Sequence, residues 1–420
     1  MNFHNCILGL RNYELKSYFL FFTWISGSKI QFSQNRRNSI HQDRSFIILI
    51  RKSAPKNCQV STLLIPEYYI HMKNTIANPD YQNNNKTIAL WLFAVSLLIF
   101  CMIILGGATR LTRSGLSIVE WKPVTGILPP IGRDAWEVEF EKYRQFPEYQ
   151  KKNQGMSLEE FQSIFWYEYS HRLLGRIIGI VFFFPFVFFL LRKKIPSGMI
   201  LNFIFMFLLG GFQGLLGWYM VKSGLVDRPQ VSQYRLTAHL ISAIAIYAYI
   251  LWFAIGLYFK GNPGFADSQK VFKKSFSLTV LILIVILSGG FMAGTRAGFM
   301  FNTFPKMNGN WVPDGMYNLN PWIINWFENT ATIHFNHRML AYLAAVFILM
   351  FFFYARKIKL PSDISIAVKI LPVVLACQII LGISTLLLVV PVVLASLHQM
   401  FALILFSISF YITRRIHTAT

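Results

Sequence analysis

The stretch Glu168-Tyr-Ser-His171-Arg172 stands at the start of a long apolar run that begins near Leu173. Glu168 and His171 are three residues apart, so on a helix they share a face and can act on one chemical group. A related stretch, His334-Phe-Asn-His337-Arg338, stands at the start of another apolar run 166 residues further along the chain. This recurrence predicts a duplicated helical unit with histidines at equivalent positions.

The composition indicates an integral membrane protein. Of the 420 residues, 54% are hydrophobic and only 14% are charged, whereas soluble domains carry about 25% charged residues. The formal net charge of +22 could suggest nucleic-acid binding, but most basic residues lie in an N-terminal arm or beside apolar runs. A membrane topology explains that distribution better. We therefore expect a lipid bilayer, and no nucleic acid, as a partner.

The cysteines do not indicate a disulfide framework or a thiolate metal site. Cys6, Cys58, Cys101 and Cys377 include no pair with the spacing of a metal or redox motif. The last two lie inside apolar runs. Metal chemistry in this chain would therefore depend on other ligands.

Eight apolar runs are long enough to cross a bilayer, which requires about 20 residues. They cover approximately residues 88–108, 173–191, 199–220, 236–259, 275–293, 338–355, 367–390 and 392–412. We predict an all-α integral membrane protein with eight transmembrane helices as two pseudo-symmetric four-helix bundles, residues 87–260 and 261–420. Residues 1–86 form a poorly ordered basic arm in this prediction. It is either a transit peptide or dispensable, with translation starting at Met72, and we favour the second reading.

Cationic loops predict the orientation in the membrane. They follow the second run (Arg192, Lys193, Lys194), the fourth (Lys260, Lys270, Lys273, Lys274), the sixth (Arg356, Lys357, Lys359) and the eighth (Arg414, Arg415). Such loops stay on the cytoplasmic or matrix side, so both termini should lie there. The long polar segments 109–170 and 294–336 should then face outward. We expect a bacterial plasma membrane first and a mitochondrial inner membrane second.

Four histidines fall at one predicted depth, at the outer ends of the four even-numbered runs: His171, His239, His337 and His398. A single histidine in a membrane helix is more often a hydrogen-bonded packing residue. Four at one depth, two in each repeat, favour ligands instead. Zinc usually has three or four protein ligands, whereas haem iron needs two axial ligands on opposite sides of a flat ring. Two facing helices of a four-helix unit can provide such a pair.

The two halves match in more than hydropathy. Gly106-Gly-Ala-Thr-Arg-Leu-Thr-Arg-Ser-Gly115 ends the first run, and Gly289-Gly-Phe-Met-Ala-Gly-Thr-Arg-Ala-Gly298 ends the fifth. Gln213-Gly-Leu-Leu-Gly217 in the third run parallels Gln378-Ile-Ile-Leu-Gly382 in the seventh. Small residues of this kind either make room for a macrocycle or let helices pack closely. Two related four-helix units are the simplest explanation.

Charged residues beside the histidines suggest further roles. Five arginines on the outer side could pair with haem propionates or simply reach the membrane interface: Arg110, Arg113, Arg172, Arg296 and Arg338. Glu168 precedes the first histidine of the first half, whereas His334 occupies that place in the second. A carboxylate beside a haem can take a proton, so the first half is the expected reaction site. The alternative for Glu168 is a simple ion pair with Arg172.

The first outer segment, residues 109–170, also has the features of a folded cap. Trp121, Pro123, Pro129 and Pro130 suggest an ordered chain. Such a cap could shield a reactive intermediate from lipid and water, although a solvated loop fits equally well. The sequence does not choose between the two.

At this point the chain resembles the haem A synthase family, integral membrane enzymes that oxidise haem O to haem A for cytochrome oxidase. The resemblance rests on Gly106 to Ser117, on Trp121-Lys-Pro-Val-Thr-Gly-Ile-Leu-Pro-Pro130 and on Glu168 to Arg172, in order and spacing. It extends over approximately residues 87–412, through both halves. Some members carry a cysteine pair in the outer loop; this chain has none, which is typical of the proteobacterial and mitochondrial kind.

The resemblance implies roles for several residues. His171 and His239 would face the substrate haem O, and His337 and His398 would ligate a haem b. Glu168 would be a catalytic carboxylate, while Arg110, Arg172 and Arg338 would bind cofactor; His334 is not carried over as a ligand. The reaction would turn the ring methyl at C8 into a formyl group, with water as oxygen donor, giving haem A.

The same resemblance implies partners, and it leaves competing functions to be weighed. Haem O synthase would supply the substrate, the product would serve cytochrome oxidase assembly, and an unidentified acceptor would take the electrons.

The alternative function is a bis-histidine membrane cytochrome that only transfers electrons. Such a carrier usually has haems at both membrane faces. A transporter is a third possibility, but nothing in the sequence indicates broken helices near mid-membrane.

Overall fold

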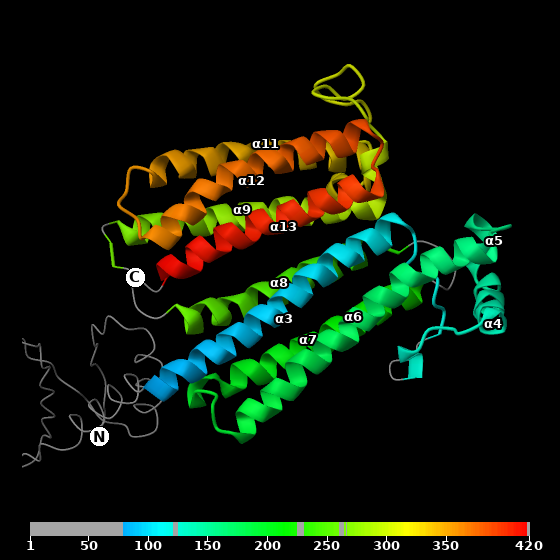
Figure 1. The fold of residues 1–420 in the computed structure, drawn as a ribbon. Helices are drawn as coiled ribbons and strands as arrows, with labels where there is room; N and C mark the ends of the chain where they lie inside the picture. Colours follow the sequence, from blue (N-terminus) through cyan, green and yellow to red (C-terminus); the bar gives the residue numbers. More distant parts are fainter. Residues whose placement is uncertain (1–78, 121–124, 225–230, 260–263, 266, 418–420) are drawn as a thin grey trace, which may run out of the picture. The chain divides into compact units, whose positions relative to one another are not determined.

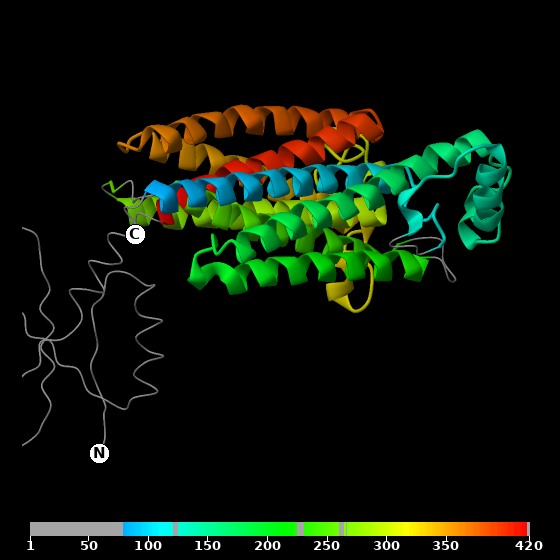
Figure 2. The same cartoon turned by 60° about the horizontal axis from the view of Figure 1, so that its bottom comes forward.

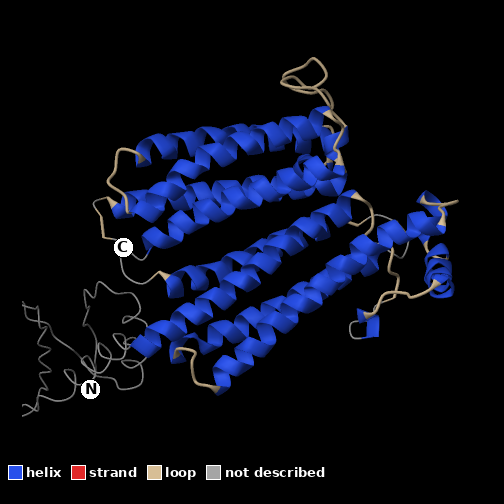
Figure 3. Ribbon diagram, in the orientation of Figure 1, coloured by secondary structure: helices blue, strands red, loops and turns tan. Residues whose placement is uncertain are grey.

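The computed structural model describes residues 79–420 except 121–124, 225–230, 260–263, 266 and 418–420. Within these ranges the chain consists of helices and connecting loops (Figure 3). Nearly all of the predicted N-terminal arm, residues 1–78, lies outside the described part. The first helix begins at Pro79, eight residues before the boundary predicted for the arm, with a proline at a position that helix starts tolerate well.

Eight long helices account for the predicted membrane crossings, and each is long and apolar enough to span a bilayer. They are α3 (Pro79–Leu111), α6 (Leu158–Leu191), α7 (Ile200–Gly224), α8 (Gln233–Tyr258), α9 (Ser268–Thr295), α11 (Thr330–Ala355), α12 (Ser362–Leu387) and α13 (Val392–His417). The predicted all-α integral membrane class and the number of eight spans are confirmed for the described residues.

The packing of these helices repeats between the two halves. Helices α3 and α8 pack together, as do α9 and α13, and contacts of α8 with α9 and of α13 with α3 join the halves. Helices α6 and α7 flank α3 and α8, whereas α11 and α12 flank α9 and α13. Figures 1 and 2 show this order, with the first half in blue to green and the second in yellow-green to red.

The duplication is also visible in the backbone conformation of the turns that follow α3 and α9. Arg113, just after α3, and Arg296, just after α9, both have φ of 57°. This left-handed conformation commonly ends a helix. These arginines occupy equivalent places in the two repeated motifs, so the same helix ending was kept in both copies.

Burial separates the interior of the bundle from a surface suited to lipid. Trp91 of α3 is buried and stacks on Phe203 of α7, with ring centroids 5.8 Å apart. By contrast, large apolar side chains of α7 remain exposed, among them Leu201, Leu208 and Leu215. A soluble protein rarely leaves so many such side chains in water, so this face of α7 suits contact with acyl chains.

Helix α6 is longer than the apolar run that predicted it. It begins at Leu158, because Ser157 and Glu160 form a reciprocal capping box at its start. His171 therefore lies well inside α6 rather than at its mouth. The sequence Ser-Leu-Glu-Glu at 157–160 carried the signal for this earlier start.

The first outer segment is a folded cap and not merely a solvated loop. It contains η1 (Thr125–Ile127), α4 (Arg133–Arg144) and α5 (Pro147–Lys152), which precede α6. Trp136, Phe140 and Tyr143 of α4 form a buried cluster with Phe161 and Phe165 of α6. Trp121 and Pro123, named in the cap prediction, lie outside the described residues.

Shorter elements belong to the remaining connections. The second outer segment contains η3 (Ala297–Phe299), η4 (Trp322–Ile324) and α10 (Asn325–Glu328), and η2 (Ser197–Met199) precedes α7. The chain between η3 and η4 forms the loop that projects beside α11 and α12 in Figure 1. Asn325 is fully buried at the base of this loop and exchanges hydrogen bonds with the backbone of Leu319.

Candidate functional site: two histidine pairs

The four predicted ligands come from four helices at equivalent places in the two halves. His239, His337 and His398 lie near the starts of α8, α11 and α13, and His171 lies in α6. Within each half the two imidazoles are close enough to interact electrostatically, His171 with His239 and His337 with His398. The structure therefore places both members of each predicted pair in the same half and near each other, and that each pair holds one metal centre stays a prediction.

Polar side chains contact three of the four rings. Ser288 Oγ of α9 lies 2.7 Å from Nδ1 of His337. Gln213 Nε2 of α7 lies 3.1 Å from Nδ1 of His239. In the second half, Nε2 of Gln378 lies 3.5 Å from Nε2 of His398. Of the three, Ser288 can accept a ring N–H because its own hydroxyl donates to the carbonyl oxygen of Val285, and such an acceptor commonly orients a metal-ligating histidine; the two glutamine amide nitrogens are donors.

The sequence had shown part of this arrangement. In each half a histidine follows the glutamine, 26 residues later in the first half and 20 in the second, but only the structure shows that the side chains meet. Ser288 had no signal of its own, since its equivalent in the first half is Leu105. The ring of His337 is therefore held by a hydroxyl that the first half cannot offer.

Glu168 and Arg172 join the cap to α6. Arg172 Nη2 donates to Glu168 Oε1 at 2.6 Å, and Glu168 Oε2 accepts from Ser117 Oγ and from the Ile118 amide, both at 2.8 Å. Arg172 also donates to the carbonyl oxygens of Ile118 and Glu120. The side chain of Glu168 is only 4% exposed. The ion pair that we weighed as an alternative thus exists, and it holds the loop after α3.

The second half contains the same clamp with histidine in place of glutamate. His334 Nδ1–H donates to the carbonyl oxygen of Ala297 at 2.9 Å, and its Nε2 accepts from Arg338 Nε at 3.2 Å. Arg338 further donates to the carbonyl oxygens of Phe301, Thr303 and Pro305. Both ring nitrogens of His334 are therefore engaged within the protein, which gives this residue a role in holding the loop.

Three of the five outer arginines, Arg110, Arg172 and Arg338, donate to backbone carbonyl oxygens. Arg110 donates to the carbonyl oxygens of Ala293 and Gly294 at the end of α9, so it joins the two halves. Burial and the nearby charge of Arg113 lower the pKa of Arg296, which lies just beyond α9. For Arg110, Arg172 and Arg338, propionate binding stays a prediction that must be reconciled with these contacts.

A second buried carboxylate lies in the cap. Glu148 of α5 is 5% exposed and accepts a hydrogen bond from the Tyr143 hydroxyl at 3.4 Å. Burial, followed by repulsion from Glu168, raises the pKa of Glu148 to about 7. No sequence signal distinguished Glu148 from the other cap carboxylates.

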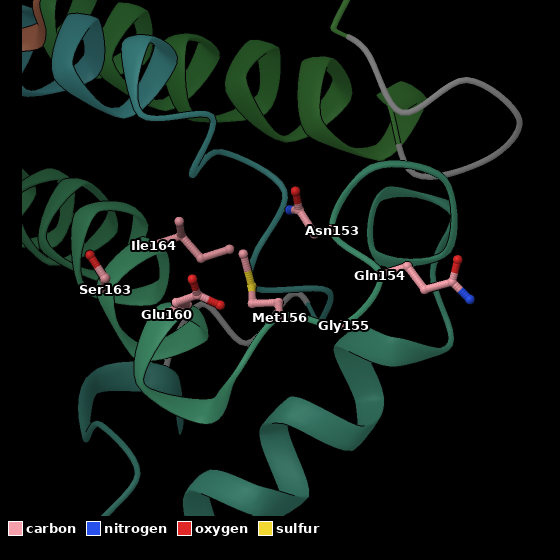
Figure 4. Close-up of a pocket in the computed structure, with 7 residues that line it drawn as sticks. All are labelled: Asn153, Gln154, Gly155, Met156, Glu160, Ser163 and Ile164. Atoms are coloured by element: carbon pink, nitrogen blue, oxygen red, sulfur yellow. The ribbon is translucent and has the colours of Figure 1, made fainter.

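A surface hollow of the cap is not part of this site. It lies where α5 meets α6 and is lined by side chains that include Asn153, Met156 and Ile164 (Figure 4). None of the four paired histidines lines it. The candidate site is therefore defined by the histidine pairs inside the bundle and not by this hollow.

The histidine pairs fit a haem better than a bare metal ion. The described residues contain no group of three or more His, Cys, Asp or Glu side chains that could hold a metal by themselves. A porphyrin supplies four ligands of its own, so two imidazoles complete the coordination. Nδ1 of His398 is also buried without a hydrogen-bond partner in the described part of the chain. Such an atom in a native structure calls for a ligand or another explanation.

Fold and site together define a multi-pass helical membrane protein, built by duplication, with one histidine pair in each half. Residues 89–410 match the model of the COX15-CtaA family, described as cytochrome oxidase assembly protein. The chain belongs to this family.

Similar proteins cover most of the chain. "Heme A synthase" of Nitrosospira multiformis is 50% identical over 333 residues, which is 79% of this chain and 94% of that protein. "Heme A synthase" of Nitrosomonas eutropha is 49% identical, over 80% of this chain and 95% of that protein. "Heme A synthase COX15" of Arabidopsis thaliana is 42% identical, over 77% of this chain and 73% of that protein. Such relatives therefore occur in bacteria and in a plant.

Proposed function

We propose that this protein is a haem A synthase, an oxidoreductase that converts haem O into haem A for cytochrome oxidase. The observation that carries the proposal is the pair of imidazoles at equivalent places in two repeated units. Family membership and relatives named for this activity support it.

The first half is the proposed reaction site. His171 and His239 hold the substrate haem O, and Glu168 accepts a proton from the oxidised group or from the attacking water. Converting the methyl group at C8 to a formyl group uses one water molecule and releases four protons and four electrons. The contacts of Glu168 with Arg172, Ser117 and Ile118 hold this carboxylate in one position, as the proposed role of a base requires.

The second half is proposed to bind a haem b between His337 and His398, which provides an electron-transfer centre. Ser288 donates its hydroxyl hydrogen to the carbonyl oxygen of Val285 and can accept from Nδ1–H of His337, so Nε2 of His337 would be free to hold the group. His334 replaces the carboxylate in this half and is committed to Ala297 and Arg338. At the place of Glu168 the second half therefore has an imidazole whose two ring nitrogens are both engaged, which supports a role in electron transfer alone.

The proposal also names the partners of the protein and the membrane that contains it. Haem O synthase supplies the substrate, an acceptor that remains to be identified receives the electrons, and the product passes to cytochrome oxidase assembly. The protein is a multi-pass membrane protein. We propose a bacterial plasma membrane, with a mitochondrial inner membrane as the second choice, and both termini on the cytoplasmic or matrix side because cationic loops lie at that end.

The test is chemical. The protein is expressed in a host that makes haem O but lacks its own haem A synthase, and extracted haems are separated and identified by mass. Haem A should appear with the wild-type chain and disappear with Glu168→Ala, while haem b stays bound. Wild-type protein that binds haem b but forms no haem A would instead favour the bis-histidine electron carrier.

A further inference from the structure

Each of the four paired imidazoles lies against a glycine of a neighbouring helix. His171 of α6 meets Gly106 of α3, and His239 of α8 meets Gly217 of α7. The second half repeats both contacts, with His337 of α11 against Gly289 of α9 and His398 of α13 against Gly382 of α12. The glycines are themselves related by the repeat, Gly106 with Gly289 and Gly217 with Gly382.

The contacts leave little or no space for a side chain. A Cβ atom placed on Gly382 would lie 2.8 Å from Cε1 of His398, and one on Gly217 would lie 3.0 Å from Cε1 of His239. On Gly106 it would lie 3.1 Å from Nε2 of His171. The contact on Gly289 is looser, since the Cβ atom would lie 3.5 Å from Cε1 of His337. An alanine at the tighter positions must displace the imidazole or separate the helices.

Ordinary helix packing does not account for this pattern. A close approach to glycine is not special to histidine, since other glycines also receive neighbouring side chains: Gly107, Gly256, Gly290 and Gly294. However, a Cβ atom on Gly210, Gly211 or Gly214 of α7 would meet no heavy atom of a neighbouring helix within 4 Å in the described chain. Glycine in a helix interior costs about 0.5–1 kcal/mol relative to alanine. What singles out the four contacts is that they include every paired imidazole and recur in both halves.

We infer that Gly106, Gly217, Gly289 and Gly382 are positioning residues, which let each imidazole approach the neighbouring helix and so set its position and ring orientation toward a haem iron. This inference rests on the proposed function, because it takes the four rings as haem ligands. A glycine fixes one side of each ring, whereas Ser288, Gln213 and Gln378 contact ring nitrogens of His337, His239 and His398. Steric and polar contacts together restrict ring rotation.

The decisive comparison is Gly382→Ala with His398→Ala, in full-length protein purified in detergent. Haem b content is measured as the pyridine haemochrome, and ligand geometry by electron paramagnetic resonance of the ferric protein. The largest g value of a low-spin bis-imidazole haem depends on the angle between the imidazole planes. We expect Gly382→Ala to lower haem b affinity by on the order of tenfold or to shift this g value. Gly289→Ala should have a smaller effect because its contact is looser.

Two variants of α7 provide the matched control. Gly217→Ala should disturb haem in the first half, whereas Gly214→Ala, three residues away and facing open space, should leave both haem spectra unchanged. If Gly382→Ala fails to fold, the comparison of Gly217→Ala with Gly214→Ala still tests the inference. Unchanged spectra in Gly382→Ala and Gly217→Ala, together with loss of haem b in His398→Ala, would overturn this inference but leave the proposed function intact. Retention of haem b in His398→Ala would instead overturn the proposed function.

Discussion

The clamp formed by Glu168 and Arg172 allows a quantitative prediction. In Arg172→Ala, a carboxylate that is 4% exposed loses its cationic partner, and the carbonyl oxygens of Ile118 and Glu120 lose their donor. Breaking a buried ion pair by removing one partner typically costs about 3–5 kcal/mol. We expect the free energy of unfolding to fall by that amount, because Ser117 and Ile118 alone cannot compensate the buried charge.

The double variant Glu168→Gln/Arg172→Ala separates the ion pair from the loop contacts. With no charge left buried, it should be more stable than Arg172→Ala alone by about 1.5 kcal/mol or more. The measurement is unfolding in mixed micelles on titration with a denaturing detergent, for the wild type, both single variants and the double variant. If the effects of the two single changes simply added, the two side chains would not be coupled and this explanation of the clamp would be wrong.

The same variants distinguish a catalytic Glu168 from a purely structural one. Glu168→Gln keeps the size of the side chain and an oxygen that can accept from Ser117 and the Ile118 amide. If Glu168 is the base, this variant should form no haem A although its cap still resists limited proteolysis. Normal haem A formation by Glu168→Gln would restrict Glu168 to holding the loop.

Three further predictions concern Ser288 and Glu148, which the sequence did not single out, and His334, which it did. Ser288→Ala should weaken haem b binding about 10–100-fold, measured by haem titration, while the Leu105→Ala control should not, and equal effects would exclude the hydrogen bond to His337 as the cause. Glu148→Gln should raise the melting temperature more at pH 8 than at pH 5, because the pKa of Glu148 is raised to about 7 and its stabilising protonated form is lost as the pH rises toward that value; an equal shift at both pH values would contradict this. His334→Ala should expose the loop after Ala297 to protease yet keep haem b, and loss of haem b would make His334 part of the haem site.

Much of the helical framework could be predicted, because apolar runs of membrane length and a repeated motif are visible in the sequence. The repeat also predicted which histidines pair, and that each pair holds a haem stays a prediction. What local pattern could not show was the side-chain register between helices. The contact of Gly382 with His398 and that of Ser288 with His337 depend on how neighbouring helices are rotated, which no single segment specifies.

The outer segments were harder to predict for a different reason. Residues 158–172 are amphipathic, so a search for apolar runs missed the first turns of α6, although the Ser157 and Glu160 capping box was present. The exchange of Glu168 for His334 suggested a chemical difference between the halves. The structure adds that both residues orient an arginine which holds a loop, so the exchange also preserves a structural role.

The central claim is that each half holds one haem between its own two histidines. The most direct measurement is the haem content and low-spin spectrum of four purified variants, His171→Ala, His239→Ala, His337→Ala and His398→Ala. We predict that the first two lose the same haem and retain haem b, whereas the last two lose haem b. If His171→Ala and His337→Ala lost one and the same haem, the ligands would pair across the halves and the account would be contradicted.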